Sequence, residues 1–276
     1  KKGIGMKITK WLQVSLFLII TSSIAQQKTN NNNNNNQDKI DFEKALNTPW
    51  KEVFSDTGTE DWRKQWFLDG EIGSASTSKK GMQLTAGPKF LNDAHHMVLW
   101  TKDSFEGDLK IEFDFTRLDF ESRCVNILYI QATGVGDAPF AKDIHKWNAY
   151  RQVPTMRMYY EYMNTYHISF AANPNLGENR EGYIRARRYM PKKTGLKGTE
   201  LTPDYFPKNL FEPGVLHHIT VVKKDSELFM KIQNSSQTFY GHFRNENCPI
   251  VTEGRIGLRV MYTRSSLFSN FTIAKQ

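Results

Sequence analysis

The chain has 276 residues, 39% of them hydrophobic, and 37 basic against 29 acidic side chains give it a formal net charge of +8. This is the composition of a globular protein, and without an RNP-like, helix-turn-helix or zinc-finger pattern the charge does not indicate nucleic-acid binding. Two cysteines cannot form a structural zinc site alone. Cys124 and Cys248 could pair in an oxidising compartment or remain two thiols.

The first 25 residues have the order of an export signal. Lysines precede an apolar run, WLQVSLFLIITSS, and Ser23-Ile24-Ala25 is a small-x-small cleavage site. The run is too short for a membrane span and no second one follows it, so we expect an exported protein, periplasmic or secreted. Its net charge would fall to +4, because the signal holds four lysines and no acid.

Residues 26–38 contain an unbroken asparagine run, Asn30–Asn36, which predicts a disordered leader. Residues 39–276 are enough for a single domain, since β-sandwiches of roughly 200–250 residues are common. Helical periodicity is limited to Asp41–Leu46 and Asp143–Arg151.

Alternation of apolar and polar residues dominates the rest of the chain. In LKIEFDFTR (Leu109–Arg117) four apolar side chains share one face and four polar ones the other. Many such strands with few helices predict an all-β sandwich or jelly roll. The other predicted strands are Met97–Thr101, Val125–Gln131, Arg157–Met163, Val215–Lys223, Glu227–Gln233, Arg255–Tyr262 and Leu267–Ala274.

The closing segment, GRIGLRVMYTRSSLFSNFTI, contains two alternating strands that meet at Thr263–Ser266 and therefore predicts a hairpin. Its G-x-I-G-L-R opening and N-F-x-I ending resemble concanavalin A-like domains that handle carbohydrate. The fold expected from this resemblance is a concanavalin A-like jelly roll of two antiparallel sheets. Binding modules and enzymes share that fold.

Common catalytic motifs are missing from the sequence. It has no G-x-S-x-G, H-E-x-x-H, P-loop or dinucleotide glycine motif, and it lacks the E-x-D-x-x-E of laminarinase-type jelly rolls. Glu112 and Asp114 share a strand face, but two acids so placed are more often solvated than catalytic. Adjacent histidines on a strand point to opposite faces, so neither His95-His96 nor His217-His218 can chelate one ion. His96 opens a strand, where its side chain can face a groove.

Two neighbouring motifs, NTYHISF and YIRARRYMP, could line such a groove. In the first, Tyr166 faces one side of the strand and His167 the other, and in the second Arg185 and Arg187 share a face. Guanidinium groups suit the carboxylate or sulfate of an acidic sugar. The alternative is a strand whose charges only keep it soluble. Aromatic side chains that could stack on sugar rings include Trp100, Trp147, Tyr159, Tyr160 and Tyr162.

The order of HHMVLW, IEFDF, NILYIQATGVGD, NTYHISF and YIRARRYMP resembles a family of secreted concanavalin A-like proteins. That family, labelled a domain of unknown function, occurs in bacterial polysaccharide-utilisation systems, and the sequence is also similar to the oligosaccharide dehydratases of ulvan degradation. The resemblance covers His95 to Pro191 and the closing segment. It carries over His96, Asn164, Tyr166, His167 and Arg185, whereas RARR departs from the family's Arg-Lys pattern and leaves the roles of Arg187 and Arg188 open.

The chemistry implied by this resemblance is β-elimination or dehydration next to a uronate. Arg185 with Asn164 would neutralise the carboxylate, His96 or His167 would be the base, and Tyr166 the acid. Arg187, Tyr160 and Trp100 would complete the substrate contacts. No metal is needed if an arginine neutralises the carboxylate, although a divalent ion could replace it.

Two other functions remain open from the sequence. One is a non-catalytic, lectin-like carbohydrate-binding module, and the other is a glycoside hydrolase on the same fold. The expected partner in each case is a polysaccharide or oligosaccharide, which for a lyase would be acidic, with or without sulfate groups. The sequence does not decide between a monomer and a homodimer.

Overall fold

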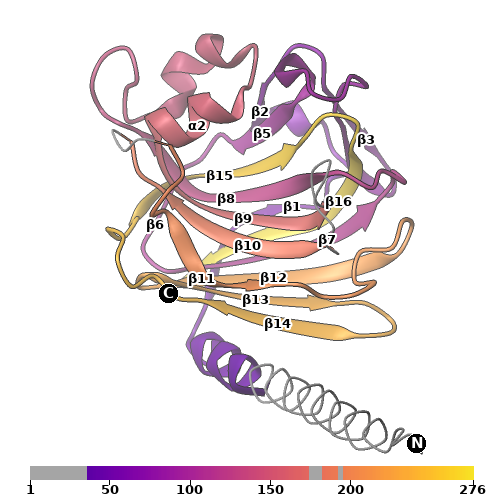
Figure 1. The fold of residues 1–276 in the computed structure, drawn as a ribbon, viewed down its shortest axis with the longest axis vertical. Helices are drawn as coiled ribbons and strands as arrows, with labels where there is room; N and C mark the ends of the chain where they lie inside the picture. The colour runs from indigo at the N-terminus through magenta and orange to yellow at the C-terminus, as the bar shows by residue number, and fades with distance from the viewer. Residues whose placement is uncertain (1–35, 174–181, 192–194) are drawn as a thin grey trace, which may run out of the picture.

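The computed structural model describes residues 36–173, 182–191 and 195–276, which form two curved antiparallel sheets packed face to face (Figure 1). In sheet A the strand order is β14-β13-β12-β7-β16-β4-β3, with β1 also paired to β16. Its strands are β1 (Lys51–Asp56), β3 (Ser74–Ser78), β4 (Gly81–Thr85), β7 (Leu109–Arg117), β12 (Leu216–Lys224), β13 (Glu227–Gln233), β14 (Thr238–Phe243) and β16 (Ser265–Lys275).

Sheet B has the order β11-β10-β9-β8-β15-β5-β2, with β6 also paired to β15. Its strands are β2 (Trp66–Asp69), β5 (Met97–Thr101), β6 (Phe105–Glu106), β8 (Cys124–Gly134), β9 (Met163–Asn173), β10 (Tyr183–Tyr189), β11 (Glu200–Tyr205) and β15 (Glu253–Val260). The all-β prediction is confirmed.

The main core fills the space between the sheets. Alternation brings Ile111, Phe113 and Phe115 of β7 to the inner face of sheet A, where they are fully buried. Tyr166 and Ile168 of β9 face them from sheet B. The hydrophobic effect stabilises the sandwich, because each such side chain contributes about 1.5–3 kcal/mol on burial.

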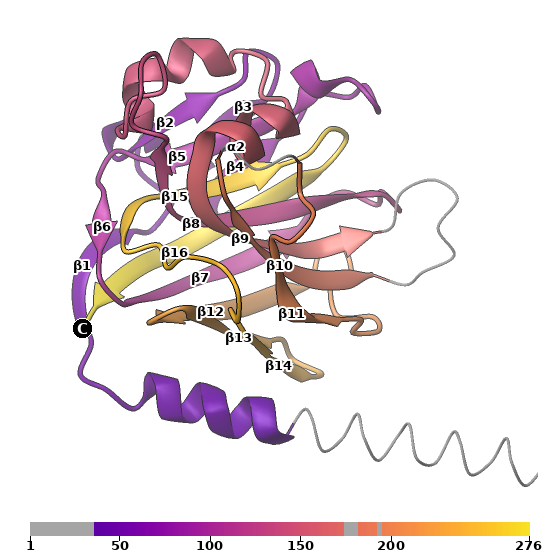
Figure 2. The same ribbon diagram turned by 60° about the vertical axis from the view of Figure 1, so that its left-hand side comes forward.

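Two smaller cores lie on the outer faces of the sheets. A helical segment with η3 (Ile144–Arg151) and α2 (Met156–Tyr162) lies against sheet B, contacting β2, β8, β9 and β10 (Figure 2). A helix over residues 36–46 lies against sheet A and packs Phe42 and Ala45 on Val222 and Phe229. The remaining short helices are η1 (Trp62–Lys64) and η2 (Asp93–His95).

The sequence predicts a strand over Arg157–Met163, but most of this segment is helical in the structure. Residues Met156–Tyr162 form α2, capped by Thr155, whose side chain accepts a hydrogen bond from the Met158 amide. Arg157 and Glu161 then form an (i, i+4) ion pair on the exposed side. Alternation of apolar and polar residues predicts a strand here, but of the tyrosines in this segment only Tyr159 is fully buried.

The predicted closing hairpin is also wrong. β15 pairs with β5, β6 and β8 in sheet B, whereas β16 pairs with β1, β4 and β7 in sheet A. The turn before Ser265 therefore crosses from one sheet to the other. Two adjacent alternating strands have the same sequence pattern in either arrangement.

Residues 36–38, which the sequence assigns to the end of the leader, belong to the described helix, and Asp38 is buried. The expected signal and the rest of the leader lie outside the described residues. Cys124 and Cys248 do not form a disulfide with each other. In the described part of the chain, no helix is both long enough and apolar enough to cross a membrane.

Candidate functional site

Strand register aligns the predicted motifs across the outer face of sheet B. Tyr129 of β8 pairs with His167 of β9, which pairs with Arg187 of β10. In the adjacent row, Arg259 of β15 pairs with Ile127, and Ile127 pairs with Ser169. Three consecutive strands, β8, β9 and β10, and the distant β15 thus contribute side chains to one polar cluster.

The helical segment is held over this face by Asp69, at the end of β2. One carboxylate oxygen of Asp69 accepts hydrogen bonds from Trp100 Nε1 (2.7 Å), Arg151 Nε (2.6 Å) and the Tyr159 hydroxyl (2.9 Å). The other accepts from Asn148 Nδ2 at 2.6 Å. Asp69 and Arg151 are both fully buried, so this is a paired charge in the interior.

Arg259 lies at the deep end of the cluster, with its guanidinium 4.6 Å from the centre of the Tyr159 ring. Its Nη2 donates to His96 Nδ1 at 2.5 Å and to the Pro154 carbonyl at 2.6 Å. Because arginine only donates, Nδ1 of His96 is the acceptor and Nε2 carries the proton. His96 is therefore poised as a hydrogen-bond donor, which argues against the role of base.

His167 lies nearer the half-buried side of the cluster. Its Nε2 is 2.8 Å from Ser169 Oγ, and its Nδ1 has no hydrogen-bond partner among the described residues. The Tyr189 ring lies 5.0 Å away and the Tyr129 ring 5.9 Å away, centre to centre. The hydroxyls of both tyrosines lie near Arg259 and, in the part of the chain that the structure describes, make no hydrogen bond of good geometry.

Burial keeps the titratable groups of this cluster uncharged. Desolvation, together with the charge of Arg259, lowers the pKa of His96 to about 2. Desolvation and the charges of Arg187, Arg259 and Arg185 lower the pKa of His167 well below its usual value. Desolvation raises the pKa of Tyr189 well above its usual value. Both imidazoles are thus neutral and this phenol is protonated at neutral pH.

A half-buried rim surrounds the buried end of the cluster on the β9–β10 side. Arg185 forms a two-donor ion pair with Asp204, and Arg187 pairs with Glu200 at 2.8 Å. The two arginine side chains are 24% and 14% exposed, so a ligand can reach them. Tyr160 of α2 is also half-buried, and its ring stands edge-on to that of Tyr189.

The predicted site residues divide between the two faces of sheet B. The outer face brings together His96, Trp100, Tyr160, His167, Arg185 and Arg187. Tyr166 lies on the inner face, in the core between the sheets, with its hydroxyl near Asn245. Asn164 accepts from Arg188 Nη2, away from His167. Tyr166 and Asn164 therefore do not share a site with His167, because alternation turns them to the other face.

Sequence reasoning missed four members of the cluster: Asp69, Tyr129, Tyr189 and Arg259. Tyr189 has the same parity in its strand as Arg185 and Arg187, so the alternation already placed it on their face. Arg259 stands in the segment for which the sequence predicts a closing hairpin. Its place beside Ile127 depends on β15 pairing with β8, which local sequence does not reveal.

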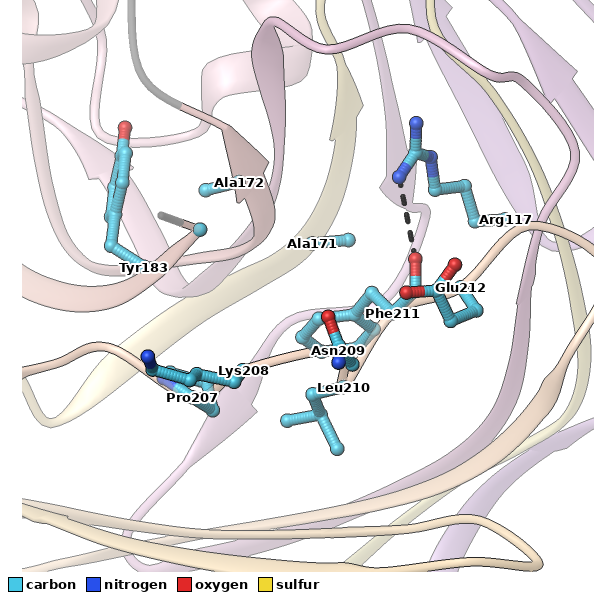
Figure 3. A pocket seen from close by; sticks show the side chains of 11 residues that line it. Arg117, Ala171, Ala172, Tyr183, Pro207, Lys208, Asn209, Leu210, Phe211 and Glu212 are labelled. Atoms are coloured by element: carbon cyan, nitrogen blue, oxygen red, sulfur yellow. Dashed lines mark hydrogen bonds between the residues drawn. The ribbon is translucent and has the colours of Figure 1, made fainter. Parts of the chain in front are cut away.

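A separate cavity of about 270 Å³ opens between the ends of β9 and β10 and the loop before β12 (Figure 3). Arg117 lines it, but this guanidinium already bonds to Asp119 and to the Phe211 carbonyl. None of the cluster residues described above lines this cavity. We favour the cluster as the functional site because its buried polar atoms still lack partners among the described residues.

A family model for a domain of unknown function, DUF1961, matches residues 55–273, most of the chain. The chain belongs to the DUF1961 family. No curated protein matches this DUF1961 sequence.

Solved structures share the fold of this DUF1961 domain at low sequence identity. A galectin-like protein of unknown function from Bacillus subtilis superposes with a TM-score of 0.64 and 15% identity, over 83% of this chain and all of that one. The lumenal domain of VIP36, bound to Ca²⁺ and Man3GlcNAc, has a TM-score of 0.54 and 11% identity, over 82% of this chain and 90% of that one. Basic winged bean lectin with Tn-antigen superposes with a TM-score of 0.55 and 10% identity, over 81% of this chain and 98% of that one. These similarities show that the DUF1961 domain has a lectin-like jelly-roll fold.

Proposed function

We propose that this DUF1961 domain binds carbohydrate on the outer face of sheet B. The observation that carries the proposal is that half-buried Tyr160 and Arg187 lie beside Tyr189 and His167, whose buried Oη and Nδ1 atoms lack partners among the described residues. Sugars present hydroxyls for such polar atoms and apolar ring faces for aromatic side chains. Carbohydrate is also what the VIP36 domain and the winged bean lectin hold in their structures. The predicted export signal would bring the domain to glycans in the periplasm or outside the cell.

Titration calorimetry against a panel of plant and algal oligosaccharides tests this proposal. We expect at least one glycan to bind, and Tyr160→Ala to weaken its binding by about tenfold, because a stacked ring contributes roughly 1–2 kcal/mol. Tyr240→Ala is the matched control, since Tyr240 lies on sheet A against the N-terminal helix. Absence of binding across the panel, or equal loss in both variants, would contradict the proposal.

A second candidate function, elimination next to a uronate, is favoured by the neutral His167 beside the protonated Tyr189. His167 Nδ1 would take the proton from C5 and the C5–H electrons would form the C4=C5 double bond. The C4–O bond would break, and the Tyr189 hydroxyl would give its proton to the departing oxygen. Ulvan is one polymer that contains such uronates.

The elimination candidate has its own test. Unsaturated uronates absorb in the ultraviolet, so turnover of uronate-containing oligosaccharides is followed directly. We expect Tyr189→Phe and His167→Ala to reduce turnover by about 100-fold or more while glycan binding remains measurable. His218→Ala, on the outer face of sheet A, is the matched histidine control. Binding without an unsaturated product would leave the domain as a binding module, and new reducing ends without unsaturation would indicate hydrolysis.

A further inference from the structure

Arg259 is a fully buried cation with no acidic partner among the described residues. Its guanidinium is 0% exposed, and its hydrogen bonds go to a neutral imidazole and a backbone carbonyl. In the same part of the chain, Nε and Nη1 make no hydrogen bond of good geometry, and the Tyr129 hydroxyl lies near the guanidinium. A buried charge is costly unless it is both paired and hydrogen-bonded. The described residues therefore place no carboxylate in direct contact with this charge, and Asp93 Oδ1 lies 3.9 Å from the His96 Nδ1 to which Arg259 donates.

The other arginines on the outer face of sheet B contrast with Arg259, because each has a carboxylate partner. Arg151 pairs with Asp69, Arg255 with Asp143, Arg185 with Asp204, and Arg187 with Glu200. Arg264, equally buried, pairs with Asp119 at 2.9 Å. Arg188 of β10, on the opposite face, is also buried without an acidic partner among the described residues, but it bonds to the carbonyls of Pro249 and Tyr189 and to Asn164. Across residues 36–173, 182–191 and 195–276, no carboxylate forms a hydrogen bond to Arg259. On this face the fold thus supplies an acid to each neighbouring arginine and none to Arg259.

The groups around Arg259 also present more donors than acceptors. Nε and Nη1 of Arg259 and Nε2 of His96 are N–H groups without acceptors among the residues that the structure describes. The Tyr129 and Tyr189 hydroxyls, which lie near the guanidinium, can each donate one hydrogen bond and also accept. A neutral hydroxyl would satisfy one or two of these groups. An anion, which only accepts and carries the opposite charge, complements the whole set.

We infer that Arg259, with His96 beside it, recognises an anionic substituent of the bound sugar, a carboxylate or a sulfate. This inference rests on the proposed function, because it places the anion on the same glycan that occupies the β9–β10 rim. Pro154 and Tyr159 cover the guanidinium. The ligand therefore reaches Arg259 only when this part of the helical segment moves away from sheet B.

Matched glycans test the inference on the unmodified protein. Short oligosaccharides of galacturonate and glucuronate are compared with their carboxyl-reduced counterparts, and a sulfated galactan oligosaccharide with its desulfated form. We expect the acidic member of one pair to bind about tenfold to a hundredfold more tightly, as a charge-assisted pair of hydrogen bonds provides. The pair that shows the difference identifies the substituent as carboxylate or sulfate.

Variants then assign the difference to Arg259. In Arg259→Met the acidic and neutral members should bind equally, whereas Arg259→Lys should keep part of the preference because it retains the charge. Arg244→Met is the control, since Arg244 lies directly after β14 and contacts Asp41 of the N-terminal helix. Protection of the amides of residues 154–162 from hydrogen exchange should fall when the acidic glycan binds.

Each outcome decides a separate question. Equal affinity for acidic and neutral members in the unmodified protein, or a preference that persists in Arg259→Met, would overturn the inference while glycan binding stands. Failure of every glycan to bind would overturn the proposed function as well. If Arg259→Met does not fold, the matched glycans and Arg259→Lys still decide whether the inference holds.

Discussion

The ring of Trp100 occupies the space where a side chain on Gly257 would lie. The two residues are register partners in β5 and β15, and a Cβ on Gly257 would be 2.5 Å from Cζ3 of Trp100. This lets the indole cross β15 and stack on Tyr129, with ring centres 5.2 Å apart. The absence of one side chain therefore joins the aromatic groups of β5 and β8.

Gly257→Ala should lower the free energy of unfolding by about 1–3 kcal/mol, because the added methyl group collides with an indole in a packed interior. Urea denaturation measures the loss. Trp100→Phe removes part of the obstructing ring, so the double variant should lose less than the sum of the single variants. Additive losses would show that the two side chains do not compete for this space.

Asp69→Asn should destabilise the protein by about 3–5 kcal/mol, because it leaves Arg151 buried without a counter-charge. Thermal and urea unfolding measure this change. The matched control is Asp204→Asn, whose partner Arg185 is partly exposed, and there the loss should stay below about 1 kcal/mol. Similar losses in the two variants would mean that burial of the Asp69 pair has no special weight.

Stability should fall in acid, partly because of His96 and His167. The folded pKa of each lies below the unfolded value of about 6.5, so the unfolded chain binds a proton that the folded one does not. The stabilisation is complete above the unfolded pKa and is lost as the pH falls toward the folded one. When the pH falls from 7.5 to 5.5, each histidine should lower the free energy of unfolding by about 1.4 kcal/mol.

Urea denaturation at the two pH values measures this effect. Over the same pH interval, the free energy of unfolding of His167→Asn should fall by about 1.4 kcal/mol less than that of the unmodified protein. His218→Asn serves as the control, because His218 lies on an exposed face beside Asp114. An unchanged pH dependence in His167→Asn would show that the pKa of this imidazole is the same in the folded and the unfolded protein.

Phe42→Ala should release the helix of residues 36–46 from sheet A. Phe42 is 2% exposed, and its ring lies 5.6 Å from that of Tyr240, while Asp41 bonds to His242 at 2.9 Å. The apolar burial of Phe42 provides most of the stabilisation, because the polar contact of Asp41, which is partly exposed, contributes little by itself. Hydrogen exchange should show lost protection in 36–46 and unchanged protection in β12 and β13.

Ile40→Ala is the control for this variant, because Ile40 is half exposed on the same helix. Loss of protection throughout sheet A in Phe42→Ala would instead show that the helix is an integral part of the domain. Unchanged protection in 36–46 would mean that polar contacts alone hold the helix.

Local alternation was enough to predict several strands to the residue. Met97–Thr101, Leu109–Arg117 and Glu227–Gln233 coincide with β5, β7 and β13. The same pattern placed His167 and Tyr166 on opposite faces, which the structure confirms. Successive side chains of a strand point to opposite faces of the sheet. In a strand with one face toward the core, the alternation of apolar and polar residues therefore predicts the face of each residue.

The pairing of strands was decided only by the tertiary structure. The motif around Arg259 reads as a hairpin strand, yet it lies between β8 and β5, which puts Arg259 near Tyr129 and His96. The alternation fixes a side chain's face but not its neighbours, because these come from segments more than 100 residues away. The sequence thus determined a β-sandwich with His167 facing outward, and only the packed sheets revealed a buried arginine with no described acid beside it.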